Sequence, residues 1–182
     1  MSIEELCDKY KIRNYTINDD GSIDVNESVF LNGQADSANP DGLTHIPLKF
    51  NKVDGHFDCS HNQINTLEGS PKYVTGDFYC ESNSLISLEG SPERVDGAFD
   101  CSNNGLKSLK GSPKYVTSDF NCSNNGLKTL EESNLIETKS FDCSYNILTD
   151  LKGCPKKIGG GFSCHNNYLT TLEGCPKIIK GH

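Results

Sequence analysis

The sequence predicts a mainly β repeat solenoid, in which short coils of chain stack around a continuous apolar core. Three observations predict it: a period of 21 residues, a recurring core motif, and a turn signal after that motif. The motif is F-x-C-x-x-N-x-[IL]-x-x-L, and in five of its six copies a Gly-x-Pro sequence and then Val or Ile follow. Such self-similarity is typical of repeat architectures, because one unit alone does not bury its own apolar residues. The cysteines that mark the period are Cys59, Cys80, Cys101, Cys122, Cys143 and Cys164.

Each unit predicts one strand and one return segment. The apolar residue two before the cysteine, such as Phe99, alternates with polar neighbours, which indicates a short strand with one buried face. Leu106 and Leu109 follow at interior positions. Gly111 and Pro113 then predict turns and extended chain on the return side, since glycine permits a tight bend and proline fixes its own backbone.

An asparagine occupies the third position after every cysteine. Its side-chain amide carries both donors and acceptors, so it can satisfy backbone groups where the chain turns out of the strand and can bond to the next coil. We therefore expect a structural ladder of asparagines. Its members are Asn62, Asn83, Asn104, Asn125, Asn146 and Asn167.

The stretch Phe78-Tyr-Cys80-Glu-Ser-Asn83-Ser-Leu85-Ile-Ser-Leu88 resembles the LxLxxNxLxxL core of leucine-rich repeats, with Phe and Cys in the first two slots. The short period and the LxGxP return are similar to repeats of bacterial effectors, and more closely to the CSxNxLxxLEGxP arrays of bacteriophage and large-virus proteins. This resemblance covers roughly residues 43–182. It implies an arc with a parallel sheet on the concave face and extended chain and turns on the convex side. It also implies a binding surface rather than one particular chemistry.

The N-terminal residues 1–28 predict a small cap. Ser2 and Glu5 have the spacing of a capping box, and we expect an amphipathic helix over residues 3–13. Residues 15–17 and 23–25 then form a small hairpin around an Asn-Asp-Asp-Gly turn. A solenoid exposes its core at its ends, so a helix and hairpin at this position would cover the first coil.

Residues 29–55 predict a divergent first coil, and residues 56–182 the six regular repeats. Val29 and Leu31 take the strand slots of the first coil, and Leu43 takes a later slot seven residues too far along the chain. We expect the extra residues to form an inserted loop within 32–40. Such loops often carry binding, and as often are tolerated insertions.

The fourth regular repeat departs from the pattern on its return side. Glu132, Asn134 and Glu137 stand where other repeats have Gly, Pro and Val. We expect Leu135 and Ile136 to supply the buried side chains out of register, so that the coil bulges.

The C-terminal end lacks a visible cap. The sequence stops at His182, where a further strand would begin, so we expect a bare strand edge that a second copy or another partner covers. The chain has no apolar run long enough for a membrane span and no signal peptide at its start. These features favour the cytoplasm, or the host cytoplasm for a viral protein.

The nine cysteines predict packing rather than chemistry. A buried free cysteine behaves as a small apolar residue, and no CxxC or HxxxH spacing accompanies these. Cys143, Cys154, Cys164 and Cys175 form the one cluster that merits comparison with a metal site, and packing is favoured there too. The five histidines do not recur at one repeat position, and no phosphate loop, GxSxG or HExxH motif is present. We therefore expect no enzyme, no metal and no cofactor.

The variable positions predict the functional surface. Residues on either side of each cysteine should point outward onto the concave face, including serines at Ser60, Ser102, Ser123 and Ser144. That face is rich in acids, whereas lysines share the slot after the prolines at Lys72, Lys114, Lys156 and Lys177. With a net charge of −8, the pattern favours a protein with a basic patch over direct nucleic-acid binding. The candidate binding residues are Asp58, Asp77, Tyr79, Glu81, Asp100, Asp119, Asn121, Asp142, Tyr145 and His165.

The sequence thus favours a non-enzymatic protein-binding module. The resemblance implies that it is encoded by a bacteriophage and binds, and inhibits, a host defence protein. Two alternatives remain open: an acidic nucleic-acid mimic that blocks a nucleic-acid-binding enzyme, and a structural protein that self-assembles through its C-terminal edge. A solvated surface kept soluble by like charge explains the acids equally well.

Overall fold

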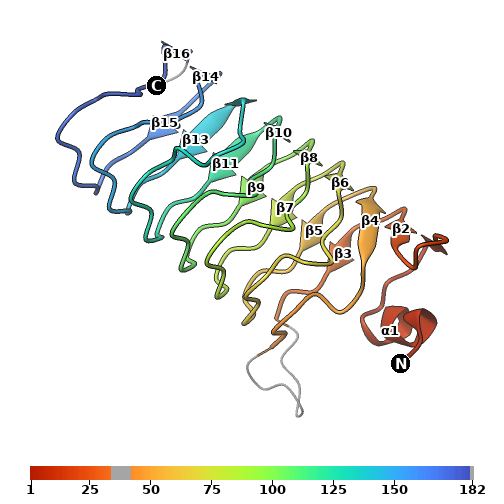
Figure 1. The fold of residues 1–182 in the computed structure, drawn as a ribbon. Coiled ribbons are helices and arrows are strands. Elements are labelled where there is room, and N and C mark those ends of the chain that lie inside the picture. The colour runs from red at the N-terminus through yellow and green to blue at the C-terminus, as the bar shows by residue number, and fades with distance from the viewer. Residues whose placement is uncertain (34–41, 181–182) are drawn as a thin grey trace.

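The computed structural model describes residues 1–33 and 42–180 and shows a β-solenoid of stacked coils, which follow one another from the N-terminal helix to the C-terminal edge (Figure 1). One strand from each coil contributes to a seven-stranded parallel sheet, here called the first sheet. Its strands in spatial order are β3 (Val29–Phe30), β5 (Phe57–Asp58), β7 (Phe78–Tyr79), β9 (Phe99–Asp100), β11 (Asp119–Asn121), β13 (Ser140–Asp142) and β15 (Phe162–Ser163). The predicted repeat solenoid is confirmed.

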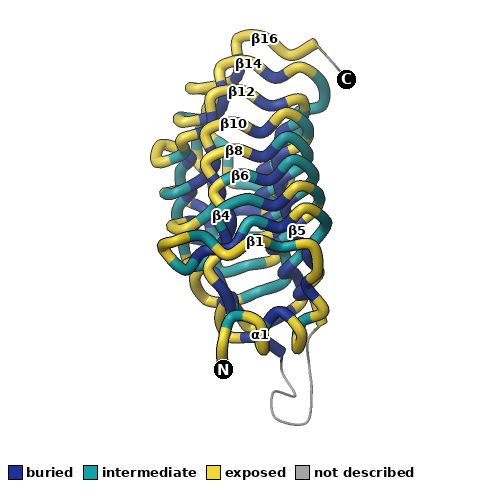
Figure 2. The backbone as a smooth tube through the Cα atoms, turned by 90° about the vertical axis from the view of Figure 1, so that its right-hand side faces the viewer, coloured by how far each residue is buried: buried dark blue, intermediate teal, exposed yellow. Residues whose placement is uncertain are grey.

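The return side of the coils also pairs from coil to coil, which the turn signals did not predict. A six-stranded sheet runs in the order β1 (Tyr15–Ile17), β2 (Ile23–Val25), β4 (Phe50–Val53), β6 (Tyr73–Val74), β8 (Arg94–Val95) and β10 (Tyr115–Val116). A separate three-stranded sheet continues it with β12 (Glu137–Thr138), β14 (Lys157–Ile158) and β16 (Ile178–Ile179). We call these two the return sheets. Figure 2 shows them from the side, stacked along the solenoid.

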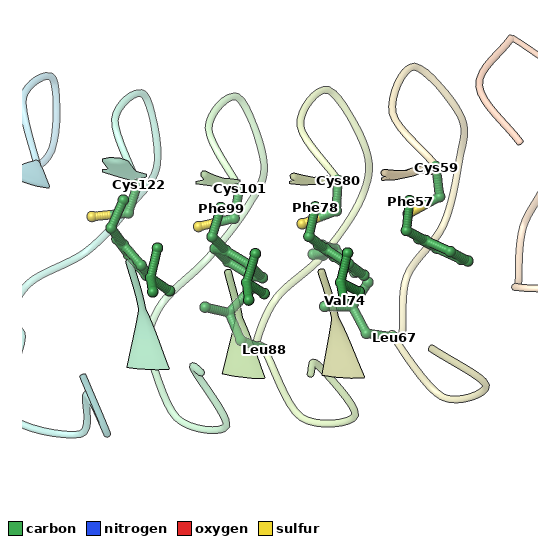
Figure 3. Close-up of a cluster of buried hydrophobic side chains, with 14 of the residues drawn as sticks. Phe57, Cys59, Leu67, Val74, Phe78, Cys80, Leu88, Phe99, Cys101 and Cys122 are labelled. Carbon is green, nitrogen blue, oxygen red and sulfur yellow. The ribbon is translucent and has the colours of Figure 1, made fainter. Parts of the chain in front are cut away.

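The core between the sheets is a set of ladders, one for each inward position of the repeat (Figure 3). Phe57, Phe78 and Phe99 stack with ring centroids 5.3 Å apart at each step. Leu67 and Val74 are likewise fully buried and come from the turn side and the return strand of one coil. Each coil is therefore stabilised mainly by its two neighbours, since a single coil is too thin to enclose these side chains.

The N-terminal cap forms as predicted, except that its helix is shorter. Helix α1 (Ile3–Lys9) begins with a complete capping box, in which Ser2 Oγ accepts from the Glu5 backbone nitrogen at 3.2 Å. The expected helix over residues 3–13 was wrong at its C-terminal end, because Lys11 adopts a left-handed backbone with φ 58°. Strands β1 and β2 form the antiparallel hairpin, and β2 pairs in parallel with β4. The hairpin thereby forms the N-terminal edge of the six-stranded return sheet.

The divergent first coil has the expected alignment. The backbone nitrogen of Leu43 donates to Asn62 Oδ1 at 2.9 Å, and Asn62 Nδ2 donates to the Leu31 carbonyl at 2.9 Å. These are the bonds that the asparagine ladder makes elsewhere, so Leu31 and Leu43 stand in the cysteine and first leucine slots. Most of the expected inserted loop, within 32–40, lies outside the described residues.

The irregular fourth repeat interrupts the return side. Thr138, not Glu137, pairs with Ile158 and is 5% exposed, and its hydroxyl donates to the Ser118 carbonyl. Leu135 is buried as expected, but the expectation for Ile136 was wrong, because it is 49% exposed. The inward position of this return segment is displaced by one residue, from Glu137 to Thr138, although the coil keeps its 21 residues. No ladder joins β10 to β12 within the described chain.

The last described coil presents its interior side chains at the C-terminal end. Leu172 is 67% exposed and Ile179 is 40% exposed, whereas Leu151 and Ile158 at the same positions of the preceding coil are fully buried. The difference arises because no coil of the described chain stacks on this last one (Figure 1).

Candidate functional site

The outward side of the first sheet, here called the strand face, places five of the ten predicted residues in one row. The parallel register pairs Asp58 with Tyr79, Tyr79 with Asp100, and Asn121 with both Asp100 and Asp142. Each of these side chains is half-buried between its neighbours. Since neighbouring strands lie about 4.8 Å apart, the row forms a regular array along the solenoid.

The aspartates of the row are held by the backbone that follows them. Asp58 Oδ1 accepts from the Ser60 nitrogen at 3.0 Å and from the Ser60 hydroxyl at 2.6 Å. Asp100 and Asp142 each accept from the nitrogen two residues ahead at 2.8 Å. One oxygen of each carboxylate thus caps the turn out of the strand, and the side chain has little conformational freedom left.

Three of the four serines expected on this face are buried instead, and Ser123 is half-buried. Ser60, Ser102 and Ser144 are only 2 to 4% exposed. The strand ends at the aspartate, and the residue two after each cysteine has a left-handed backbone, so the alternation of a strand no longer holds beyond the cysteine.

Glu81 replaces this buried serine in the second regular repeat. Its side chain is only 22% exposed, and Oε2 is buried without a hydrogen-bond partner among the described residues. Burial raises the pKa of Glu81, and the neighbouring charges of Asp100 and Asp58 raise it further. His61 Nε2 lies 3.9 Å from Oε1 and partly offsets these effects.

The two acids at strand starts differ from each other. Asp77 is bonded within the protein, because Oδ1 accepts from the Ala98 nitrogen at 2.7 Å and Oδ2 accepts from the Tyr79 hydroxyl at 2.9 Å. Burial and this bond raise the pKa of Tyr79 to about 12. Asp119 begins β11 and is exposed. Of the two, Asp119 is the one available to a partner.

Tyr145 and His165 follow β13 and β15 and come together beside the row. Their rings form an edge-to-face pair with centroids 5.0 Å apart, and Tyr145 is 52% exposed. The Ser163 hydroxyl lies 2.8 Å from His165 Nδ1. The pair adds an exposed aromatic surface to an otherwise polar face.

The asparagine ladder ties adjacent coils together. Asn83 Nδ2 donates to the carbonyl of Cys59, one coil earlier, at 3.0 Å, and to that of Cys80 at 3.2 Å. Its Oδ1 accepts from the Ile64 nitrogen at 2.9 Å. All six asparagines make the equivalent bonds, so their role lies in holding the strand face rather than in contacting a partner.

The cysteines are free thiols, and most are buried. The Cys101 thiol donates to the Asn121 carbonyl of the next strand at 3.3 Å, and burial raises its pKa well above the ordinary value. The pKa of Cys154 is also raised, to about 12, mainly by burial. Over residues 1–33 and 42–180, no cluster of three or more His, Cys, Asp or Glu side chains has the arrangement of a metal site.

No protein family, curated protein or solved structure matches this chain. The described part of the chain contains no helix long and apolar enough to cross a membrane. The functional proposal therefore rests on the surfaces of the protein.

A second surface, the outward side of the return sheets, was missed by the sequence analysis; we call it the return face. Tyr73, Arg94 and Tyr115 are cross-strand neighbours, and the Arg94 guanidinium lies 6.0 Å from the centroid of each tyrosine ring. Lys114 lies over Tyr115, and both line a groove of about 590 Å³ together with Arg94. The residue types at this position change from coil to coil, so periodicity alone gave no signal for the row.

Proposed function

We propose that this chain is a non-enzymatic protein-binding module whose strand face takes a protein with a basic patch. The register of the row carries this proposal: Asp58, Asp100 and Asp142 lie in alternate coils and are fixed by the turns that they cap. Carboxylates held in place lose little further freedom on binding, and so they favour a partner with matching cations.

Exposed aromatic residues support a protein as the partner. Tyr145 stands beside the acidic row and is half-exposed, and its pairing with His165 restricts its motion. Tyrosine is enriched among the few residues that dominate the energy of protein interfaces. We expect Tyr145 to be such an anchor.

The spacing of charge favours this proposal over a nucleic-acid mimic. Charged residues of the row lie two coils apart, or about 10 Å, with the uncharged Tyr79 and Asn121 between them. Duplex DNA carries one charge per about 1.7 Å of its axis. The row is thus a sparse imitation of a phosphate backbone, even with Asp119 added.

Because the repeats resemble arrays of bacteriophage and large-virus proteins, we extend the proposal to the organism that encodes the protein and to the cell in which it acts. A bacteriophage-encoded module would act in the host cytoplasm, and its basic partner would be a host protein, such as a defence protein that it inhibits.

A pull-down from the natural host cell tests the proposal. The bait is the full chain, compared with a variant that carries Asp58→Asn, Asp100→Asn and Asp142→Asn. Asparagine at Asn121 already makes the same turn-capping bond, to the Ser123 nitrogen at 3.0 Å, so the triple variant should keep the fold. We expect a stoichiometric partner to be lost from it, and Tyr145→Asn to weaken the same capture.

The matched control changes the same number of charges away from the strand face, by Glu68→Gln, Glu131→Gln and Asp19→Asn, at exposed positions. It should retain the partner. Retention of every partner by the strand-face variant would overturn the proposal.

A further inference from the structure

Two rows of opposite charge run along the solenoid with the same spacing. Aspartates of the strand face recur every second coil, and in the same coils a lysine occupies the position just before the return strand. In the other coils that position holds Glu93, Leu135 and Lys177. The two sets come from the same three coils, in which each lysine follows its aspartate by the same number of residues. They are Asp58, Asp100 and Asp142, and Lys72, Lys114 and Lys156.

The stacking of the coils gives both rows one pitch. Strands at equivalent positions are parallel neighbours, so charges two coils apart are separated by about 10 Å on either row. Glu93 lies between Lys72 and Lys114 in the intervening coil, where it reduces the repulsion between these two lysines. In the three coils that carry an aspartate on the strand face, the position before the return strand always carries the opposite charge.

The lysines of this row have no acidic partner among the residues that the structure describes. Lys52, Lys110 and Lys157 form ion pairs with neighbouring carboxylates. For Lys72, Lys114 and Lys156, all exposed, no carboxylate of the described residues lies within ion-pair distance. Their charges are therefore available to another molecule.

Residues typical of protein interfaces lie beside the lysines. Tyr73, Arg94 and Tyr115 form a stacked row on the return face, and Arg94 and Tyr115 line the groove that Lys114 also lines. Tyrosine and arginine are the residue types most enriched at interface hot spots. The return face thus combines unpaired cations with aromatic anchors.

We propose that a second copy of this chain is a partner of the strand face, and that its return face docks there coil against coil. This inference rests on the proposed function, because it names the source of the basic patch that the strand face takes. Asp58, Asp100 and Asp142 of one copy face Lys72, Lys114 and Lys156 of the other. The two faces lie on different sides of the solenoid (Figures 1 and 2), so the contact is heterologous and continues into a ring or filament.

Sedimentation velocity of the purified full chain tests the inference. At low ionic strength the weight-average mass should rise with concentration above the 20.0 kDa of one chain. It should fall back to that of the monomer near 1 M salt, where the screening length is only about 3 Å.

Charge-swapped variants make the test specific. One variant carries Lys72→Glu, Lys114→Glu and Lys156→Glu, and the other carries Asp58→Lys, Asp100→Lys and Asp142→Lys. Each variant alone should stay monomeric, because its two faces have the same sign. An equal mixture should assemble again, because each face then meets its opposite.

A matched control changes three exposed lysines elsewhere, by Lys11→Glu, Lys107→Glu and Lys128→Glu. It shifts the net charge equally and should still assemble. If the aspartate-to-lysine variant does not fold, the aspartate-to-asparagine variant replaces it, and we expect that variant to lose self-association while circular dichroism shows the native fold.

A chain that stays monomeric at every protein and salt concentration would overturn the inference. Self-association that is the same in the wild-type chain and in each charge-swapped variant would overturn it too. Assembly abolished by Leu172→Glu but not by the swaps would also overturn it, and would place the contact at the C-terminal edge. In each case the proposed function fails only if the strand-face variant also retains every host protein in the pull-down.

Discussion

The side-chain nitrogen of Asn104 lies 3.0 Å from the carbonyl oxygen of Cys80, one coil earlier in the chain. The same nitrogen donates to the carbonyls of Cys101 and Ser102, and Asn104 Oδ1 accepts from the Leu85 nitrogen at 3.0 Å. One side chain thus satisfies backbone groups of two coils at the point where each leaves the first sheet. Stability and the geometry of the strand face depend on the same contact.

Replacing Asn104 with alanine should lower the free energy of unfolding by about 2–4 kcal/mol, because the Leu85 N–H loses its acceptor in a closed site. Asn104→Asp should also destabilise the protein. The aspartate keeps the acceptor for the Leu85 N–H, but a carboxylate oxygen replaces the amide nitrogen that donates to three carbonyls. Urea unfolding measures both changes. Lys107→Ala, at an exposed position of the same coil, should stay within about 0.5 kcal/mol of the original protein. Equal stability of all three variants would refute the role of the ladder.

Two glycines of one repeat should respond differently to alanine. Gly111 has φ +85°, and a Cβ there would lie 2.6 Å from the Leu88 carbonyl carbon. Gly111→Ala should therefore destabilise the protein by at least about 2 kcal/mol. Gly105 has ordinary backbone geometry and room for a Cβ, 3.5 Å from the Leu85 carbonyl oxygen. Gly105→Ala should be neutral or slightly stabilising in a thermal melt. A loss of stability equal to that of Gly111→Ala would show that close packing at Gly111 is not the cause.

Thiol reactivity should separate one cysteine from the others. Cys175 is exposed, whereas Cys59 and Cys101 are fully buried and burial raises their pKa. Because the thiolate is the reactive form, brief alkylation of the native protein should modify Cys175 first and Cys164, which is half-buried, more slowly. Peptide mass spectrometry identifies the labelled sites. Rapid native labelling of Cys101 would show that the coils open, and full labelling in urea is the control.

The carboxyl of Glu81 should make stability depend on pH. Burial raises its pKa in the folded state, so folding favours the protonated form, and stability is lost as pH rises through that raised value. Glu81→Gln should stabilise the protein near pH 7, and the gain should vanish below about pH 4, where the carboxyl is protonated in both states. Urea midpoints at the two pH values measure this. The exposed Glu68→Gln is the control, and a gain independent of pH would point to packing instead.

Much of the fold followed from local spacing. The alternation around Phe99 and Cys101 predicted the strand, and Ser2 with Glu5 predicted the start of α1. The end of that helix was not predicted, because a positive φ at Lys11 leaves no clear mark in the sequence. Likewise Ser60 has the spacing of an outward residue, yet the turn that Asp58 caps encloses it.

Part of the candidate site depends on neighbours far apart in the chain. Asp77 looked like a surface acid, but its oxygens are taken by Ala98 and Tyr79. The repeat pattern did not predict the row of Tyr73, Arg94 and Tyr115, because the residue type at this position differs from coil to coil. Only the register of the return strands shows that they stack.

The sequence by itself determined the period, the inward residues and the asparagine ladder, because each repeats the same local chemistry in every coil. The tertiary structure decided the pairing of the return side, the break between β10 and β12, and which acids remain free on the strand face. These features arise where one coil contacts the next. A backbone group or a carboxylate is satisfied there by atoms about one period away. At Thr138 the inward position moves by one residue in the return strand alone, because Phe141 still pairs with Phe120 at the regular spacing.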